Sequence, residues 1–215
     1  MNYLAVCGHG DPNLEGGEYK RSIELLYAIA FTLKMSKKSD YQIKGYFDYV
    51  VPPLEGFWWQ DGQVQAIDYT NKDQFNFISA IRLPDFITRT DFDWAVKTAT
   101  EKKCQDFSKV QFLSYDEGLC VQCLHLGSYD SEPATITAMS QHTTEQGYEL
   151  DIQNPRYHHE IYLSDPRRCS EDKLKTVIRH PIKKSNSWFS AIIKMKNPEA
   201  SFGKLIDKRI IKISH

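Results

Sequence analysis

The same order of expected elements, strand–helix–strand–strand, occurs twice along this chain of 215 residues. In the first half, strands are predicted at residues 3–9, 45–51 and 75–83, because short apolar runs there are bounded by glycine or proline. A helix is predicted at residues 18–37, where Ile23, Leu26, Ala30 and Leu33 recur at helical spacing. The first half is therefore a β-α-β-β unit.

The second half repeats this order. Strands are predicted at residues 119–126, 157–163 and 174–180, and a helix starts near Ser131 and ends before Gly147. The fold class expected is α+β: a duplicated β-α-β-β module that forms a curved antiparallel sheet, with helices on one face and a ligand groove on the other.

The segment between the repeats predicts a connecting helix at residues 92–103, with a capping box at Thr90 and Asp93, and a short strand at residues 110–113. One domain is thus expected over residues 1–184, with pseudo-repeats at about 1–84 and 117–184. Residues 185–215 carry six Lys or Arg against two Asp or Glu. This basic C-terminal tail is expected to be a disordered tail, a docking arm or a partner site.

Composition limits the classes of protein. The chain is 41% hydrophobic and 26% charged, which is ordinary for a globular domain. Its net charge of -1 supplies no basic field for direct nucleic-acid binding. The N-terminus has neither a charged segment nor a long apolar segment of a signal peptide, and no apolar run approaches a membrane span of about 20 residues. A cytoplasmic protein without a membrane role is expected.

The cysteines predict neither disulfides nor a metal site. There are five, an odd number without framework spacing. Cys120 and Cys123 form a Cys-x-x-Cys pair, but on a strand residues three apart face opposite sides, and no second pair completes a zinc site. A structural role is expected, with no metal and no cofactor.

The segment from Tyr49 to Trp59 places one carboxylate, Glu55, among aromatic residues just after two prolines. A carboxylate beside so much apolar surface is costly to ionise, and aromatic faces attract flat or cationic molecules. The segment therefore predicts a small-molecule pocket. The alternative is that Trp58 and Trp59 are ordinary core residues and Glu55 points to solvent.

A second candidate segment is residues 157–163. Strand alternation places His158, Glu160 and Tyr162 on one face, which suits a polar groove. His159 and Ile161 then lie on the other face, which suits packing beneath helices, and the two histidines cannot share a metal. Glu55 and Glu160 are the predicted catalytic residues, because a carboxylate pair can share a proton, one acting as acid and the other as base. The same pair could instead bind a flat cation.

Further residues are predicted to contact the ligand. His125 is either a structural histidine on its strand or part of the site, and Trp94 is either in the site or in the core below its helix. The predicted ligand-binding residues are Tyr49, Trp58, Trp59, Trp94, His125 and Tyr162.

Three motifs together resemble a known family. They are Pro-Leu-Glu-Gly-Phe-Trp-Trp around Glu55, Leu-His-Leu-Gly-Ser-Tyr-Asp-Ser-Glu-Pro around His125, and His-His-Glu-Ile-Tyr-Leu-Ser-Asp-Pro around Glu160. In this order they resemble the GyrI-like small-molecule-binding family over about residues 1–184. The likeness is to its stand-alone branch, which includes cyclopropanoid cyclopropyl hydrolases. This chain begins at the first strand, where relatives in the branch usually have an upstream segment.

The resemblance implies a function. Glu160 matches the groove-floor glutamate of the family, and Glu55 matches a second glutamate of the hydrolase branch. The expectation is binding of aromatic or cationic xenobiotics, with hydrolysis of electrophilic cyclopropanes as detoxification. The alternative is a ligand-sequestering protein or a protein-interaction inhibitor without turnover, whose protein partner the sequence does not identify.

Overall fold

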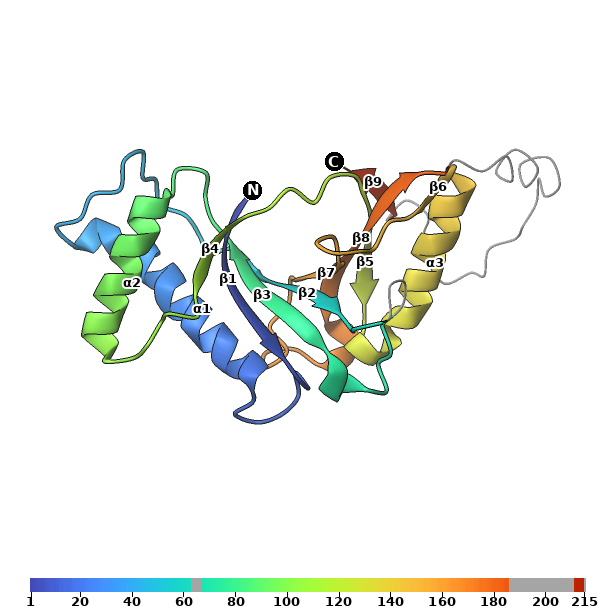
Figure 1. Cartoon of the computed structure of the whole chain (residues 1–215), viewed down its shortest axis with the longest axis horizontal. Helices are drawn as coiled ribbons and strands as arrows, with labels where there is room; N and C mark the ends of the chain where they lie inside the picture. The colour runs from blue at the N-terminus through green and yellow to red at the C-terminus, as the bar shows by residue number, and fades with distance from the viewer. Residues whose placement is uncertain (63–66, 186–210, 215) are drawn as a thin grey trace. The chain divides into compact units, whose positions relative to one another are not determined.

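The computed structural model describes residues 1–62, 67–185 and 211–214. These residues form two compact units, and each is described by itself (Figure 1). The first contains residues 1–62 and 67–116, and the second begins at Glu117. No described helix has both the length and the apolar character needed to cross a membrane.

The first unit is a four-stranded antiparallel sheet with two helices. The strand order is β4-β1-β3-β2. The strands are β1 (Asn2–His9), β2 (Leu54–Trp59), β3 (Asn76–Arg82) and β4 (Gln111–Ser114); the helices are α1 (Glu18–Lys34) and α2 (Arg89–Lys103), with short 3₁₀ turns η1 (Met35–Lys38) and η2 (Lys72–Gln74). Helix α1 packs on β1 and β3 and also contacts α2 (Figure 1).

Strand alternation decides which side chains of this sheet lie beneath α1. Leu4 and Val6 of β1 and Ile81 of β3 belong to one core cluster with the apolar face of α1. The Ser22 hydroxyl of α1 donates a hydrogen bond of 2.8 Å to the Ser79 hydroxyl of β3. The residues that alternate with these point to the opposite face of the sheet.

The second unit has the strand order β7-β8-β5-β9, and β6 pairs with the end of β8. Its strands are β5 (Cys120–Leu126), β6 (Tyr148–Leu150), β7 (His158–Tyr162), β8 (Lys175–Lys184) and β9 (Lys212–Ser214); its helix is α3 (Glu132–Glu145), and η3 (Tyr129–Ser131) and η4 (Glu171–Lys173) are 3₁₀ turns. Met139 of α3 packs with Val121, Cys123 and Ile178, so α3 covers the face of the sheet to which these residues point.

The duplication and the α+β class are confirmed. The order β1-β3-β2 in the first unit recurs as β5-β8-β7 in the second, with every pair antiparallel. In each unit a helix follows the first of these strands. A further strand pairs with the outer edge of the first strand in both units, β4 on β1 and β9 on β5. The ligand groove of the duplicated sheet stays a prediction.

The strand predicted at residues 45–51 is wrong. No strand is assigned there, and β2 starts only at Leu54. Pro52 and Pro53 precede that start, and a proline cannot donate to a strand ladder. The aromatic residues that suggested a strand pack instead on a loop residue: Tyr46 and Tyr49 contact Phe86 edge-on, with ring centroids 5.7 and 5.8 Å away.

The capping box predicted at Thr90 and Asp93 is also wrong. Helix α2 begins at Arg89, and its N-cap is Thr88. The Asp91 carboxylate accepts a hydrogen bond of 2.8 Å from the Thr88 amide, while the Thr88 hydroxyl accepts one of 3.4 Å from the Asp91 amide. The same Thr-x-x-Asp spacing occurs twice in this segment, and the chain uses the earlier one.

The C-terminal segment is in part a strand. Lys212–Ser214 pair antiparallel with Cys120 to Gln122 of β5, and Ile211 is buried in the core of the second unit. The predicted tail therefore ends in the sheet. Its other basic residues, Lys194, Lys196, Lys204, Lys208 and Arg209, lie outside the described residues.

Candidate functional site

Glu55 lies in the middle of β2, on the face opposite α1. It is paired in register with Ala80, which alternates with the α1-facing Ile81. Its exposed fraction is only 5%, so the prediction that the carboxylate is buried among aromatic residues holds and the solvent-pointing alternative is wrong. Phe57 lies on the same face and contacts Tyr115 edge-on, with ring centroids 5.3 Å apart.

The two predicted tryptophans of β2 lie on opposite faces of the sheet. Trp59 alternates with Trp58, shares the face of Glu55 and is half-buried. Trp58 is buried and packs against Tyr19 and Phe77, with ring centroids 5.0 and 5.7 Å away. Trp58 is thus a core residue, as the alternative interpretation of this segment had it.

Tyr49 and Trp94 occupy other parts of the first unit. Tyr49 belongs to the loop cluster around Phe86. Trp94 stacks on Tyr41, with centroids 4.2 Å apart and planes 8° from parallel. Trp94 also lines a hollow of about 480 Å³ together with Tyr27 and Phe31. That hollow has an aromatic lining, and Glu55 is not part of it.

Glu160 lies on the face of the second sheet that α3 covers. It is paired in register with Ile178, which packs against α3, and its exposed fraction is 7%. The predicted alternation of His158, Glu160 and Tyr162 is correct, but the assignment of faces is reversed. The sequence pattern predicts these residues on the face away from the helices and His159 on the face beneath them, and the structure shows the opposite. Strand periodicity defines two faces and does not say which of them a helix will cover.

A chain of hydrogen bonds starts at Glu160 and runs through two histidines. The Glu160 carboxylate lies 2.7 Å from Nε2 of His158, and Nδ1 of His158 lies 2.7 Å from Nε2 of His180. All three side chains are at least nine-tenths buried. The chain joins β7 to β8 and fixes the orientation of the Glu160 carboxylate.

Two residues near the start of α3 extend this group. Glu132, in the first turn of α3, is fully buried, and a carboxylate oxygen of Glu132, a ring nitrogen of His158 and a carboxylate oxygen of Glu160 all lie within 4.8 Å of one another. Tyr129 lies in the preceding 3₁₀ turn, close enough for the charges of both carboxylates to raise the pKa of its phenol. We call Tyr129, Glu132, His158, Glu160 and His180 the Glu160 cluster.

Protonation in the Glu160 cluster is shifted by burial. Burial raises the pKa of Tyr129 to about 12, and the charges of Glu160 and Glu132 contribute in the same direction, so the phenol stays neutral and can donate. Burial lowers the pKa of His180 well below its usual range, and His158 lowers it further. His180 is therefore a neutral ring at physiological pH.

His125 is held entirely by neighbouring groups of its own unit. Its Nε2 donates to the Ser128 carbonyl at 3.0 Å, so its Nδ1 accepts from the Thr135 hydroxyl at 2.8 Å. The turn that supplies Ser128 starts at Gly127, whose φ of +133° suits glycine, and a Cβ there would come within 2.9 Å of the Ser131 hydroxyl. These contacts favour the structural alternative for His125.

Tyr162 lies beside the Glu160 cluster. It contacts Tyr129 edge-on, with ring centroids 5.8 Å apart. Thr176 of β8 is paired with Tyr162 on one side and with His125 on the other. The second unit therefore brings three predicted site residues, His125, Glu160 and Tyr162, to the same face of one sheet.

A second polar network lies on the opposite face of this sheet. Glu117 accepts a hydrogen bond of 2.8 Å from Nε of Arg179, and its other oxygen lies 3.0 Å from Nδ1 of His159. Burial alone would raise the pKa of Glu117, but His159 and Arg179 hold it below its usual value. This network was not predicted from the sequence, because its members come from three separate segments.

The Cys120 and Cys123 thiols are free and buried, and they lie on opposite faces of β5 as predicted. Burial raises the pKa of Cys120 to about 12 and that of Cys123 to about 11. Both therefore remain protonated thiols, which supports a structural role.

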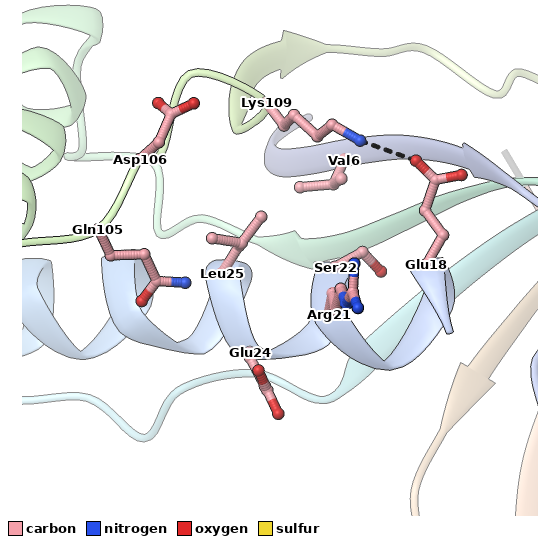
Figure 2. Close-up of a pocket in the computed structure, with 9 residues that line it drawn as sticks. All are labelled: Val6, Glu18, Arg21, Ser22, Glu24, Leu25, Gln105, Asp106 and Lys109. Carbon is pink, nitrogen blue, oxygen red and sulfur yellow. Dashed lines mark hydrogen bonds and ion pairs between the residues drawn. The ribbon is translucent and has the colours of Figure 1, made fainter. Parts of the chain in front are cut away.

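A larger hollow in the first unit does not match the predicted aromatic site. It has a volume of about 690 Å³ and lies beside α1 (Figure 2). Lys109 and Glu18 form an ion pair of 2.8 Å in its wall. Its charged and polar lining, which also includes Arg21, Glu24 and Asp106, contains none of the predicted site residues.

Two members of the Glu160 cluster were missed at the level of sequence. Glu132 directly precedes Pro133 in the motif around His125, and a carboxylate in the first turn of a helix is common enough to attract no notice. The feature that distinguishes Glu132 is its complete burial, which depends on the tertiary structure. His180 could have been found by strand alternation alone, since it is the last residue of the predicted strand and lies at even spacing from Thr176 and Ile178.

The described residues form a two-unit α+β protein with a buried polar cluster in its second unit. The profile of the GyrI-like small molecule binding domain matches residues 1–183, so the chain belongs to the GyrI-like family. The curated proteins include no match to the chain.

Solved structures from Listeria innocua are similar over most of their length. An uncharacterized conserved protein is 43% identical, with a TM-score of 0.79, over 85% of this chain and 88% of its own. A protein named as a hydrolase is 42% identical, with a TM-score of 0.76, over 85% of this chain and 87% of its own. A second structure named as a hydrolase gives 42% identity and a TM-score of 0.77 over the same shares.

Proposed function

We propose that this protein binds flat aromatic or cationic xenobiotics and hydrolyses electrophilic cyclopropanes, as a detoxifying enzyme. The observation that carries the proposal is the buried carboxylate of Glu160, oriented by His158 in a family whose domain binds small molecules. The name of the relatives that are 42% identical, hydrolase, supports turnover by water. Tyr162 and Trp59 are the aromatic residues proposed to stack on the ligand.

The proposed reaction adds water across one ring bond. The water oxygen bonds to a ring carbon, the strained carbon–carbon bond breaks, and its electron pair moves into a conjugated carbonyl. One carboxylate of the predicted pair, Glu55 or Glu160, takes the proton from water as general base. The other, protonated, donates to the developing oxyanion. General acid or base assistance is typically worth about a hundred- to ten-thousand-fold.

The test is incubation with an alkylator that carries a cyclopropane conjugated to a carbonyl, followed by mass spectrometry for the water adduct. We expect Glu160→Gln and Glu55→Gln each to lower kcat/KM by at least about a hundredfold. Glu149→Gln, an exposed carboxylate of the second unit, is the control and should match wild type. Equal turnover in wild type and the Glu55→Gln/Glu160→Gln double variant would refute the mechanism.

Binding without turnover is the second candidate. It is favoured by the family description, which names small-molecule binding alone, and it requires only one buried carboxylate for a cation. Tryptophan fluorescence quenching by a flat cationic dye measures it. Saturable quenching that Glu160→Gln weakens, together with no water adduct, would establish sequestration instead of hydrolysis.

A further inference from the structure

The Glu160 cluster contains three metal-ligand side chains from two elements. Glu132 comes from α3, and His158 and Glu160 come from the same face of β7. All three are buried, and their ligating atoms lie within 4.8 Å of one another. This combination differs from the adjacent histidines His158 and His159, which lie on opposite faces of the strand and cannot share a metal.

The charges of the group favour a cation. Two buried carboxylates this close repel each other when both are ionised, and a cation between them removes that repulsion. The arginines with ion pairs in the described part of this unit are Arg156, Arg167 and Arg179, and they pair with Asp151, Asp165 and Glu117. Tyr129 lies near both carboxylates, and His158 and His180 are joined to Glu160 by hydrogen bonds.

His180 is positioned to orient His158, one of the three metal-ligand side chains. In metal sites, the ring nitrogen of histidine that does not bind the ion usually donates to a neighbour, which fixes the tautomer. Nδ1 of His158 can donate to Nε2 of His180, and this leaves the Nε2 lone pair of His158, 2.7 Å from the Glu160 carboxylate, available to a cation.

We propose that Glu132, His158 and Glu160 bind one divalent transition-metal cation, with Zn²⁺ as the best fit, and that His180 orients His158. One imidazole nitrogen and two carboxylate oxygens are ligands that zinc accepts, and three protein ligands leave a fourth position open. Ligands about 2.1 Å from the ion stand about 3.4 Å apart on a tetrahedron, so the ion would replace the direct contact of 2.7 Å between His158 and Glu160 and move these two atoms apart by about 0.7 Å.

The experiment uses the full chain carrying Cys7→Ser and Cys104→Ser, because these exposed thiols could bind zinc themselves. Protein stripped with a chelator is titrated with zinc chloride by calorimetry, and bound metal is counted by mass spectrometry. We expect one ion per chain. Glu132→Gln and His158→Gln should weaken binding more than about tenfold, and His180→Gln by about ten- to a hundredfold.

The matched control is His159→Gln, the neighbouring residue whose ring contacts Glu117 on the other face of the sheet. Zinc affinity in this variant should equal that of the background. Absence of saturable zinc binding, or an unchanged affinity in His158→Gln, would show that the three residues form only a hydrogen-bonded cluster.

A second measurement does not depend on whether the variants fold. In protein labelled with ¹⁵N-histidine, zinc should shift the Nε2 resonance of His158 and leave that of His159 unchanged. An unshifted His158 at saturating zinc overturns the proposal. Binding is read without any substrate, so its outcome is independent of hydrolysis. Where hydrolysis occurs, zinc should inhibit it, since the ion engages the Glu160 carboxylate.

Discussion

Two buried glutamates of the second unit, Glu160 and Glu117, are held in different ways. Glu160 is hydrogen-bonded to His158, within a group that also contains the Glu132 carboxylate. Glu117 is bonded to Arg179, which is always charged, and to His159. The cationic partner favours a structural role for Glu117, whereas Glu160 is the buried carboxylate that we propose for the ligand.

Removing the charge of Glu117 should destabilise the protein. Glu117→Gln leaves the Arg179 guanidinium buried without its carboxylate, and the expected loss is about 3 kcal/mol in the free energy of unfolding, measured in urea at pH 7. Glu149→Gln, whose partner Lys183 is exposed, should change it by less than about 0.5 kcal/mol.

The lowered pKa of Glu117 predicts how the stability of the fold depends on pH. A carboxyl whose pKa is lower in the folded state stabilises the fold above its unfolded value, near 4.5, and this contribution is lost as pH falls through the folded pKa. Wild type should therefore lose stability below about pH 4.5 more steeply than Glu117→Gln. Parallel stability profiles for the two proteins would contradict the assignment.

The start of α2 shows that a contact with another segment decides which of two capping motifs the helix uses. Thr88 and Thr90 each stand three residues before an aspartate, but only Asp91 is buried and also accepts a hydrogen bond of 2.9 Å from the Tyr41 hydroxyl. That tertiary contact fixes Asp91 at the helix start. The helix consequently begins at Arg89, earlier than its apolar periodicity indicated.

Thr88→Ala should remove one half of this capping box. We expect a loss of about 1 kcal/mol in the free energy of unfolding, because the first amides of α2 lose an acceptor. Thr90→Ala is the matched control, since Thr90 is exposed within the first turn and its change should be close to zero. A larger effect at Thr90 than at Thr88 would show that the cap is misassigned.

At the scale of the whole molecule, the duplication extends further than the β-α-β-β unit. Strands β4 and β9 pair with equivalent edges, β4 on β1 and β9 on β5. The end of the chain therefore completes the second sheet as residues 111–114 complete the first. Covering the β5 edge also prevents it from pairing with another chain.

A chain ending at residue 210 should lose this edge protection. Without β9 and the buried Ile211, we expect faster hydrogen exchange at the amides of residues 120–122 and a loss of about 2–5 kcal/mol in stability of the second unit. The amides of β1 provide an internal control and should exchange as in the full chain. Unchanged exchange along β5 would mean that β9 contributes nothing to the sheet.

Much of the fold could be predicted from local patterns. Seven of the eight predicted strand and helix positions in the two repeats coincide with observed elements, because apolar spacing reports burial directly. The strand at residues 45–51 was wrong because aromatic residues also pack in loops, and β6 was too short to be recognised. Glu55 was predicted to lie beside apolar and aromatic residues, and it is buried. Glu160 was predicted to face a polar groove away from the helices, and it is instead buried on the face that α3 covers.

By itself, the sequence determined the order of the elements, the duplication and which residues of a strand share a face, since these depend on neighbours a few positions away. Only the tertiary structure decided which face α3 covers, and so placed Glu132 and His180 beside His158 and Glu160. The physical reason is that alternation has two equivalent solutions, and contacts between segments far apart along the chain select one of them.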